Sequence, residues 1–356
     1  MAGENSLKER VYRCVSGFWV GSSMGALIKG WSPDKVFQKY GSLSENTSGK
    51  AIVDAWQQVP GKVTDVVERT KLIGQAIIEK QDRIRAEDLG SVWYRILNQE
   101  NVKRTLQPYE GLLLEMIRAE IPAVEIGRYC DYSGLNNFAC ACFPIGLINA
   151  CDPEHAKEDA ENVGRLYQTA GSSGLKWAVV AAVAIASALD PRATVDNVLE
   201  NIFRLNDSDS VQREISKVLE ATSQCKSFEE IQNVFNSFYQ AEGIPYAMSF
   251  CKETVTKALS IFKFVGGDIQ KAVIFGTATG RDADSTASLA ASISGALGGS
   301  SGLPLEWIRW ADKGESEDPY TFKHFSVNSF SEELYGAMDK RIHKLQAYIS
   351  MLNGMA

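Results

Sequence analysis

Residues 277–299 read TATGRDADSTASLAASISGALGG, and this stretch decides the fold prediction. Asp282 and Asp284 precede a run of Ser, Ala, Gly and Leu that predicts a helix beginning near Ser285 and packed deep among its neighbours. Acidic side chains at a helix N-terminus gain from the helix dipole, so capping is one interpretation. The pattern also offers two carboxylates and a hydroxyl, which suit Mg²⁺ or Mn²⁺, so the second interpretation makes Asp282, Asp284 and Ser285 metal ligands.

Helical periodicity dominates the remainder of the chain, whereas the alternating patterns typical of strands are scarce. We therefore predict an all-α fold. Segments with apolar residues three or four positions apart cover residues 66–81, 86–97, 159–170, 175–189, 195–205 and 331–353. Helix starts are expected at Asp159, Thr194 and Ser227, whose side chains suit the N-cap position. Because no stretch has the composition of a linker, we predict one compact domain over residues 1–356.

The composition is that of a folded globular protein, since 45% of the 356 residues are hydrophobic and 23% are charged. A net charge of -7 without a block of Lys and Arg argues against nucleic acid as a partner. The longest apolar run, residues 177–189, is too short to span a bilayer, so no membrane association is expected. The polar N-terminus and the seven cysteines, including the packing thiols Cys140 and Cys142, favour a cytoplasmic protein with reduced thiols.

Three glycines mark the first long helix. Gly17, Gly21 and Gly25 recur every four residues and therefore form one stripe along a helix face. Each glycine inside a helix costs about 1 kcal/mol relative to alanine, so the stripe indicates a gain elsewhere. We expect that gain to be the close approach of another helix inside a soluble core.

A second acidic stretch, GKVTDVVERTKL at residues 61–72, holds Thr64, Asp65, Glu68 and Arg69. If Asp65 lies in the first turn of a helix, Asp65 and Glu68 share one helix face because they are three residues apart. One interpretation is a capped surface helix with an internal Glu–Lys pair. The other is a metal or substrate site.

The order of these segments resembles the ADP-ribosylglycohydrolase family, which includes the dinitrogenase-reductase-activating glycohydrolases. The resemblance spans nearly the whole chain and includes NNFACACFPIGLINACDPEHA at residues 136–156 and GRDADSTASLAASISGALGG at residues 280–299. It implies an all-α fold with a central cleft. It also implies two divalent cations, usually Mg²⁺ or Mn²⁺, that assist hydrolysis at the anomeric carbon of a ribosyl group.

Two metal motifs carry the resemblance. The terminal motif of the family, GxDxDT, is similar to this chain at Asp282 and Asp284, with Ser285 in place of the Thr. The family motif TDDT is matched only at its first two positions, by Thr64 and Asp65. The resemblance therefore implies that these five residues are the metal ligands.

The chain also departs from the family pattern. Val66 stands where TDDT has its second Asp, Ser22 and Lys29 stand where the first helix usually has Asp and Glu, and Ala141 replaces an Arg. A missing Asp ligand lowers the charge offered to a cation, which Glu68 would partly restore from one turn further on. A lysine cannot replace the glutamate as a base unless burial lowers its pKa well below about 10.

We therefore expect a metal-assisted glycosidase that cleaves an N- or O-glycosidic bond of a ribosylated small molecule, either ADP-ribosyl or nucleoside-like. One or two Mg²⁺ or Mn²⁺ ions would fix the ribose hydroxyls or the attacking water beside an oxocarbenium-like transition state. The expected catalytic carboxylates are Asp65, Glu68 and Asp284. The residues expected to bind substrate are Ser22, Lys29, Arg69, Asn136, Asn137 and Arg281.

Two other hypotheses stay open. The departures allow a changed reaction, such as elimination or rearrangement of a small metabolite with one cation. They also allow a crystallin-like binding protein that has lost hydrolysis. The expected partner is a small ribosylated molecule, and the expected assembly is a monomer or a small homo-oligomer.

Overall fold

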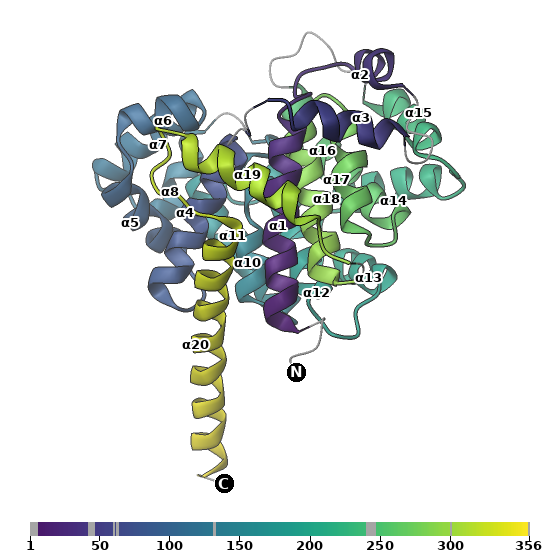
Figure 1. Cartoon of the computed structure of the whole chain (residues 1–356). Helices are drawn as coiled ribbons and strands as arrows, with labels where there is room; N and C mark the ends of the chain where they lie inside the picture. Colours follow the sequence, from purple (N-terminus) through teal and green to yellow (C-terminus); the bar gives the residue numbers. More distant parts are fainter. Residues whose placement is uncertain are drawn as a thin grey trace.

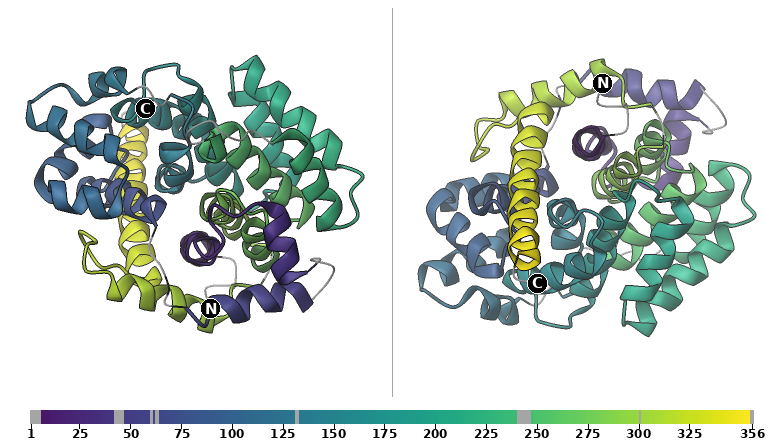
Figure 2. Two further views of the ribbon diagram at one scale, coloured as in Figure 1. Left: turned by 90° about the horizontal axis from the view of Figure 1, so that it is seen from above. Right: turned by 90° about the horizontal axis from the view of Figure 1, so that it is seen from below.

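The computed structural model describes residues 6–41, 47–59, 61, 64–130, 133–239, 247–299 and 301–354. Within these residues the chain is all-α, as predicted (Figure 1), and β-type pairing is confined to an isolated bridge between Leu135 and Phe250. Figure 2 shows the other helices arranged around a central pair, α1 and α18.

The helices of the first half include three that frame the site: α1, α4 and α7. Their bounds and those of their neighbours are α1 (Leu7–Gly25), α2 (Pro33–Tyr40), α3 (Thr47–Trp56), α4 (Asp65–Lys80), α5 (Ala86–Ile96), α6 (Gln99–Thr105), α7 (Pro108–Arg118), α8 (Ala123–Ile126), η1 (Gly127–Tyr129), α9 (Asn137–Ala141), α10 (Phe143–Ile148), α11 (Pro153–Val163) and η2 (Gly164–Leu166).

The second half supplies the other central helix and a long terminal one. The bounds are α12 (Ser173–Ala188), α13 (Val195–Leu205), α14 (Asp209–Thr222), α15 (Phe228–Phe238), η3 (Ala247–Ser249), α16 (Cys251–Phe264), α17 (Ile269–Ala278), α18 (Ala283–Leu297), α19 (Leu305–Glu317) and α20 (Val327–Asn353).

The glycine stripe of α1 packs directly on the backbone of α18. A Cβ atom added at Gly17 would lie 2.5 Å from the carbonyl oxygen of Ala291, and one at Gly25 would lie 2.4 Å from the Cα of Asp284. Gly21, between them, is equally close to the α18 backbone at 2.7 Å. Real Cβ atoms do not come this close, so the stripe allows the two helices to meet, as the spacing predicts.

Two of the expected helix starts are confirmed and one is wrong. Thr194 caps α13 and Ser227 caps α15, each accepting a hydrogen bond from a backbone N–H of the first turn. Asp159 does not begin a helix. α11 begins at Pro153, because the Asp152 side chain caps it and proline suits the first helical position, so Asp159 lies buried inside the helix.

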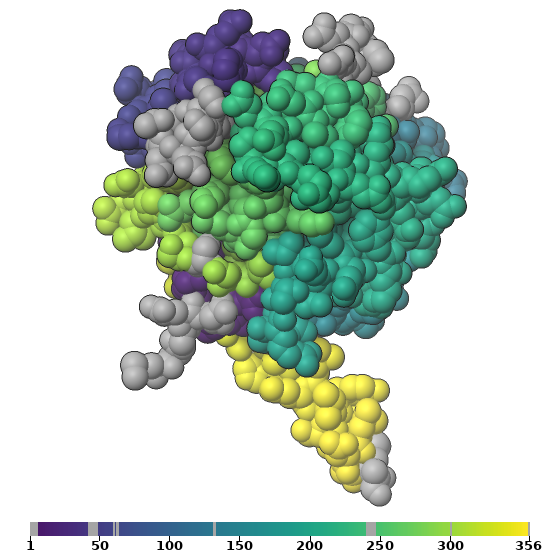
Figure 3. Space-filling view, turned by 90° about the vertical axis from the view of Figure 1, so that its right-hand side faces the viewer, coloured from purple at the N-terminus to yellow at the C-terminus, as the bar shows by residue number. Residues whose placement is uncertain are grey.

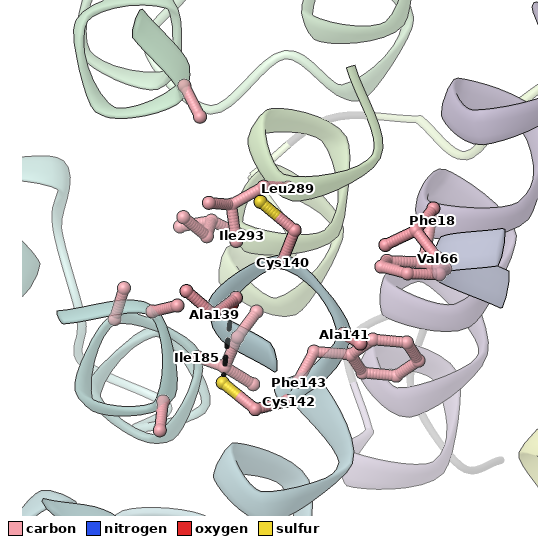
Figure 4. Packing of buried hydrophobic residues seen from close by; sticks show 14 of the residues in the cluster. Phe18, Val66, Ala139, Cys140, Ala141, Cys142, Phe143, Ile185, Leu289 and Ile293 are labelled. Carbon is pink, nitrogen blue, oxygen red and sulfur yellow. Dashed lines mark hydrogen bonds between the residues drawn. The ribbon is translucent and has the colours of Figure 1, made fainter. Parts of the chain in front are cut away.

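The predicted packing thiols lie in the hydrophobic core. Cys140 and Cys142 are buried, and Figure 4 shows them among apolar side chains that include Ile185, Leu289 and Ile293. Burial raises the pKa of Cys142 to about 12 and that of Cys140 well above its usual value. Both thiols are therefore uncharged at neutral pH.

The most apolar helix, α12, lies in the core. α12 is almost entirely buried, which agrees with the prediction for residues 177–189. No helix among the described residues is long and apolar enough to cross a membrane.

The longest helix, α20, packs on the body with its first turns and then projects from it (Figures 1 and 3), so that residues 342–354 are exposed.

Candidate active site

The ammonium group of Lys29 lies among three carboxylates from distant parts of the chain. Its Nζ is 2.8 Å from Asp284 Oδ2 and 3.3 Å from Asp65 Oδ1. Asp282 Oδ1 is farther away, at 3.6 Å. Carboxylates from early and late parts of the chain therefore meet at this point, around an ammonium group. We call Asp65, Asp282 and Asp284 the acidic cluster.

The start of α18 places two members of the cluster. α18 begins at Ala283, earlier than predicted, so Asp282 is the N-cap residue and Asp284 lies in the first turn with Ser285. The Asp282 side chain makes no capping hydrogen bond. Its Oδ2 instead accepts a hydrogen bond from Asn136 Nδ2 at 2.7 Å. Capping therefore does not explain Asp282.

Asp282 and Asp284 are buried, but hydrogen bonds do not satisfy all of their carboxylate oxygens. Their exposed fractions are 3% and 0%, and the Oδ1 atom of each has no hydrogen-bond partner among the described residues. Burial raises the pKa of Asp284 to about 8, with Lys29 opposing the shift and Asp282 adding to it. Buried acceptors without donors are costly, and such groups are characteristic of functional sites.

Two short backbone hydrogen bonds fix Lys29 beside α18. Gly30 N donates to Arg281 O at 2.7 Å, and Arg281 N donates to Trp31 O at 2.7 Å. This pairing uses left-handed backbone at Gly30, with φ of 82°, and at Arg281, with φ of 53°. A Cβ at Gly280 would lie 2.7 Å from Trp31 O, so only glycine fits there. The segment after α1 is thus tied to the residues that precede α18.

A hydroxyl pair joins α1 to the start of α4. Thr64 occupies the N-cap position of α4, yet its side chain makes no capping hydrogen bond. Its Oγ1 instead shares a hydrogen bond of 2.6 Å with Ser22 Oγ, and both side chains are buried. Ser22 and Thr64 therefore hold Asp65, the first residue of α4, against α1.

Asp65 is surrounded by donors that keep it ionised. Besides Lys29, it is contacted by Arg69 at 3.0 Å and by Gln107 Nε2 at 2.9 Å. Arg69 also forms two hydrogen bonds with Glu110, at 2.7 and 2.8 Å, inside the protein. Burial would raise the pKa of Asp65, but the charges of Arg69 and Lys29 outweigh it and hold that pKa well below its usual range. Arg69, predicted to bind substrate, is a partner of two carboxylates.

Lys29 is a fixed positive charge. Burial would lower its pKa, but the charges of Asp282, Asp284 and Asp65 together outweigh burial and raise the pKa above its ordinary value. The condition for a lysine base, a strongly lowered pKa, is therefore not met. Lys29 and Asp65 are also the members of the group with partly exposed side chains, at 32% and 18%.

Glu68, a predicted catalytic carboxylate, has different partners. It forms an ion pair with Lys71 and accepts a hydrogen bond from Thr321 at 2.7 Å. Lys71 also binds Glu315 at 2.7 Å, so these residues form a second buried charged cluster, separate from the acidic cluster. Although Asp65 and Glu68 are three residues apart, α4 directs them to separate sets of residues.

The remaining predicted residues divide in the same way. Arg281 donates two hydrogen bonds to Glu253, at 2.6 and 2.9 Å. Asn137 donates to the Tyr109 hydroxyl and accepts a hydrogen bond from Gln168 at 3.1 Å. These contacts lead away from the acidic cluster. Among the expected amides, the one that touches the cluster is Asn136.

Gln107 and Glu110, at the start of α7, belong to the site but were not predicted from the sequence. The Q-P-Y-E stretch at residues 107–110 forms a capping box, in which Gln107 N donates to Glu110 Oε2 at 2.8 Å. That signature was available to locate the helix start. Nothing in it indicates that Glu110 would reach Arg69, which is 41 residues away along the chain.

The atoms that the acidic cluster offers as ligands decide whether it fits Mg²⁺ or Mn²⁺. Three converging carboxylates, with two oxygens that accept no hydrogen bond among the described residues, have suitable chemistry for a hard cation. However, the ammonium group of Lys29 already stands among them. Within the described ranges, no three His, Cys, Asp or Glu side chains are grouped so that they could hold a metal ion. As folded, the cluster fits an ammonium group and not a metal ion at this point.

Comparisons with known proteins agree with this architecture. A family model described as ADP-ribosylglycohydrolase matches residues 3–339. An uncharacterised protein of Archaeoglobus fulgidus is 22% identical over 305 residues, which cover 85% of this chain and 91% of that protein. A solved structure described as an ADP-ribosylglycohydrolase-related protein complex is similar with a TM-score of 0.61 and 17% identity, over 94% of this chain and 99% of that one. The structural likeness shows the fold.

Proposed function

Because the chain belongs to the ADP-ribosylglycohydrolase family, we propose that it is a glycoside hydrolase whose active site is the acidic cluster with Lys29. The substrate we propose is a small ribosylated molecule, ADP-ribosyl or nucleoside-like, cleaved at its N- or O-glycosidic bond. The observation that supports this most is the meeting of Asp65 from α4 with Asp282 and Asp284 from α18 around one positive charge.

Asp65 is the carboxylate that we assign to the substrate, because its side chain is partly exposed. A carboxyl group with a lowered pKa is a poor proton acceptor. It is well suited to stabilise the positive charge that develops at the anomeric carbon in an oxocarbenium-like transition state. Asp284 and Asp282 would hold Lys29 in place, and Asn136 would hold Asp282.

The family generally uses divalent metal ions, so Mg²⁺ and Mn²⁺ belong in any assay of this chain. We assign no step to a metal, because Lys29 stands where the carboxylates meet. The residues predicted as metal ligands remain part of the proposed site. Thr64 and Ser285 would position the carboxylates of the acidic cluster.

A second candidate is a binding protein without hydrolytic activity. One observation favours it: the acidic cluster already has cationic partners within the chain, since Lys29 contacts all three carboxylates and Arg69 contacts Asp65. A site satisfied in this way has less need of a substrate or an ion than an open carboxylate site.

A screen of ribosylated compounds tests the proposal. Mass spectrometry would monitor each compound with wild-type protein, in Mg²⁺, in Mn²⁺ and in chelator, beside Asp65→Asn. The matched control is Asp196→Asn, an exposed aspartate in the first turn of α13. We expect a product that has gained the elements of water, in wild type and control but not in Asp65→Asn. A product without added water would indicate elimination or rearrangement, and equal turnover by Asp65→Asn would refute the assignment.

A further inference from the structure

We propose that Lys29 is the resident cation of the acidic cluster, so that the wild-type chain binds no divalent ion between Asp65, Asp282 and Asp284. The catalytic meaning of this inference rests on the proposed function, whereas the statement about ion binding rests on geometry alone. Nζ lies within 2.8 to 3.6 Å of one oxygen of each carboxylate. A metal ion bound to the same oxygens would occupy the same space.

The backbone sets the position of this ammonium group. The hydrogen bonds between Gly30 and Arg281, and between Arg281 and Trp31, hold the segment around Lys29 against the start of α18. On its other side, Asp65 is fixed by Arg69 and Gln107. Lys29 is therefore directed to the carboxylates by its surroundings and does not reach them merely as a flexible surface side chain.

Removal of the ammonium group would leave the buried carboxylates without a balancing charge. Asp284 Oδ2 would lose the hydrogen bond that Lys29 donates, and Asp282 would retain the neutral amide of Asn136 as its donor. The ionised forms of these two buried carboxyl groups would then lack a balancing charge beside Asp65, which makes ionising both of them strongly unfavourable. Their oxygens would be free to bind a divalent ion, because carboxylates from two helices are the donors that Mg²⁺ and Mn²⁺ prefer.

A lysine also changes how a sugar would be held. An ammonium group has three hydrogen-bond donors, and Lys29 is the part of this group that reaches the surface most. Because Asp284 and Asp65 already accept two of these donors, the third would donate to a hydroxyl oxygen of a ribose, an atom whose lone pairs a metal ion would bind. The positive charge needed at the site would then be present without any ion from solution.

Binding of MnCl2 to the purified protein tests the inference without any substrate. Isothermal titration and thermal unfolding would compare wild type, Lys29→Ala and Lys29→Arg. We expect no Mn²⁺ binding at the cluster of wild type or Lys29→Arg. In Lys29→Ala we expect a lower melting temperature in chelator, a rise of several degrees with Mn²⁺, and an affinity at least about a hundredfold above wild type.

Further variants decide between the outcomes. Lys29→Ala with Asp284→Asn should lose the Mn²⁺ response, because the new site would lack a ligand. Mn²⁺ binding by wild type that Asp282→Asn abolishes would overturn the inference, and this result does not depend on whether Lys29→Ala folds. Failure of Lys29→Ala to gain Mn²⁺ binding while folded would also overturn it. If Lys29→Ala takes up Mn²⁺ while wild type hydrolyses no compound in the screen, the proposed function is refuted and the inference about ion binding stands.

A separate observation concerns the projecting part of α20. We infer that it pairs with the same helix of a second copy of this chain. Met338 is buried against the body, and the apolar stripe then continues through Ile342, Leu345, Ile349 and Leu352 at spacings of four, three, four and three. Side chains with this spacing form one seam, which is the a/d pattern of a coiled coil.

The sequence of the seam favours a two-stranded pairing. β-branched Ile342 and Ile349 alternate with Leu345 and Leu352, and isoleucine at a with leucine at d is typical of dimers. All four are exposed, at 37% to 55%. The family match ends at residue 339, just before this exposed part begins, so the seam is not explained by the common fold. Its projection from the body leaves room for a second helix (Figure 3).

Sedimentation equilibrium over a concentration series tests this pairing. We expect wild type to dimerise, and Leu345→Glu with Ile349→Glu to be monomeric with an unchanged melting temperature, because both positions are outside the core. Ala347→Glu, an exposed position off the seam, is the matched control and should dimerise like wild type. A wild type that stays monomeric, or that binds lipid vesicles as a monomer, would overturn the inference. A dimer that survives the double substitution would do the same.

Discussion

Gly25 of α1 lies so close to Asp284 of α18 that a Cβ atom on the glycine would be 2.4 Å from the aspartate Cα. The contact lies four residues before Lys29, which binds the same aspartate. This close approach of the two central helices and the acidic cluster are therefore parts of one arrangement. Any residue larger than glycine at position 25 must move the helices apart at the site.

We expect Gly25→Ala to destabilise the protein by about 2 kcal/mol or more, because a methyl group pressed onto backbone cannot be relieved by a side-chain rotation. Urea unfolding measures the loss. Gly336→Ala in α20 is the control, since no atom lies within 4 Å of a Cβ added there. Alanine should stabilise that helix position by about 0.5–1 kcal/mol. Equal effects of the two substitutions would contradict the packing argument.

Glu110→Gln should cost about 3–5 kcal/mol, because it leaves the buried guanidinium of Arg69 without the charge that balances it. Chemical denaturation monitored by circular dichroism measures this change. Asp54→Asn removes an exposed partner of Lys50 and should have no measurable effect. A small effect of Glu110→Gln would mean that Asp65 alone is enough to balance Arg69.

Asn136→Ala should destabilise the protein by about 1–3 kcal/mol, because Asp282 Oδ2 and Thr254 Oγ1 both lose the amide that donates to them. Thermal unfolding at one pH measures the loss. Asn233→Ala, at an exposed position of α15, should change the melting temperature little. If the two asparagine variants behave alike, Asn136 does not support the cluster as described.

Alkylation of the native protein at pH 8 should modify Cys151 and spare Cys142. A thiol with a pKa of about 12 is roughly one ten-thousandth thiolate at that pH, and the thiolate is the reactive form. Raising the pH increases this fraction tenfold per unit until the pKa is reached. Peptide mapping by mass spectrometry identifies the modified residues. Cys151 is exposed, whereas Cys142 should react only after unfolding; equal labelling in the native state would contradict the burial.

The sequence was sufficient for the class of fold and for the close packing of each of the two central helices, but it did not indicate that they pair with each other. Helical periodicity, glycine spacing and the small residues of 283–297 are local properties, and local properties determine which helices form and how closely they pack. The helix starts at Thr194 and Ser227 could be predicted from their side chains for the same reason. The prediction of a helix start at Asp159 was wrong because the helix already begins at Pro153, capped by Asp152.

The site was predicted less completely, because tertiary packing determines which side chains contact one another there. Asp65, Asp282 and Asp284 could be brought together by motif and order. The sequence marked Lys29 as a departure from the family pattern, but it did not indicate that the ammonium group would stand among the carboxylates. The Glu68–Lys71 pair agrees with the internal Glu–Lys pair that was one interpretation of the sequence, whereas the contact of Glu68 with Thr321, 253 residues away, is set by tertiary packing.

Lys29 and Asp284 of the acidic cluster are synthesised far apart in time. Lys29 and Asp284 are separated by 255 residues, which a ribosome adds in tens of seconds at roughly 5–20 residues per second. Throughout that interval α1 has emerged with its glycine face uncovered, because α18 does not yet exist. Lys29 therefore lacks Asp282 and Asp284 until those residues have been synthesised, and the catalytic centre we propose cannot be complete before then.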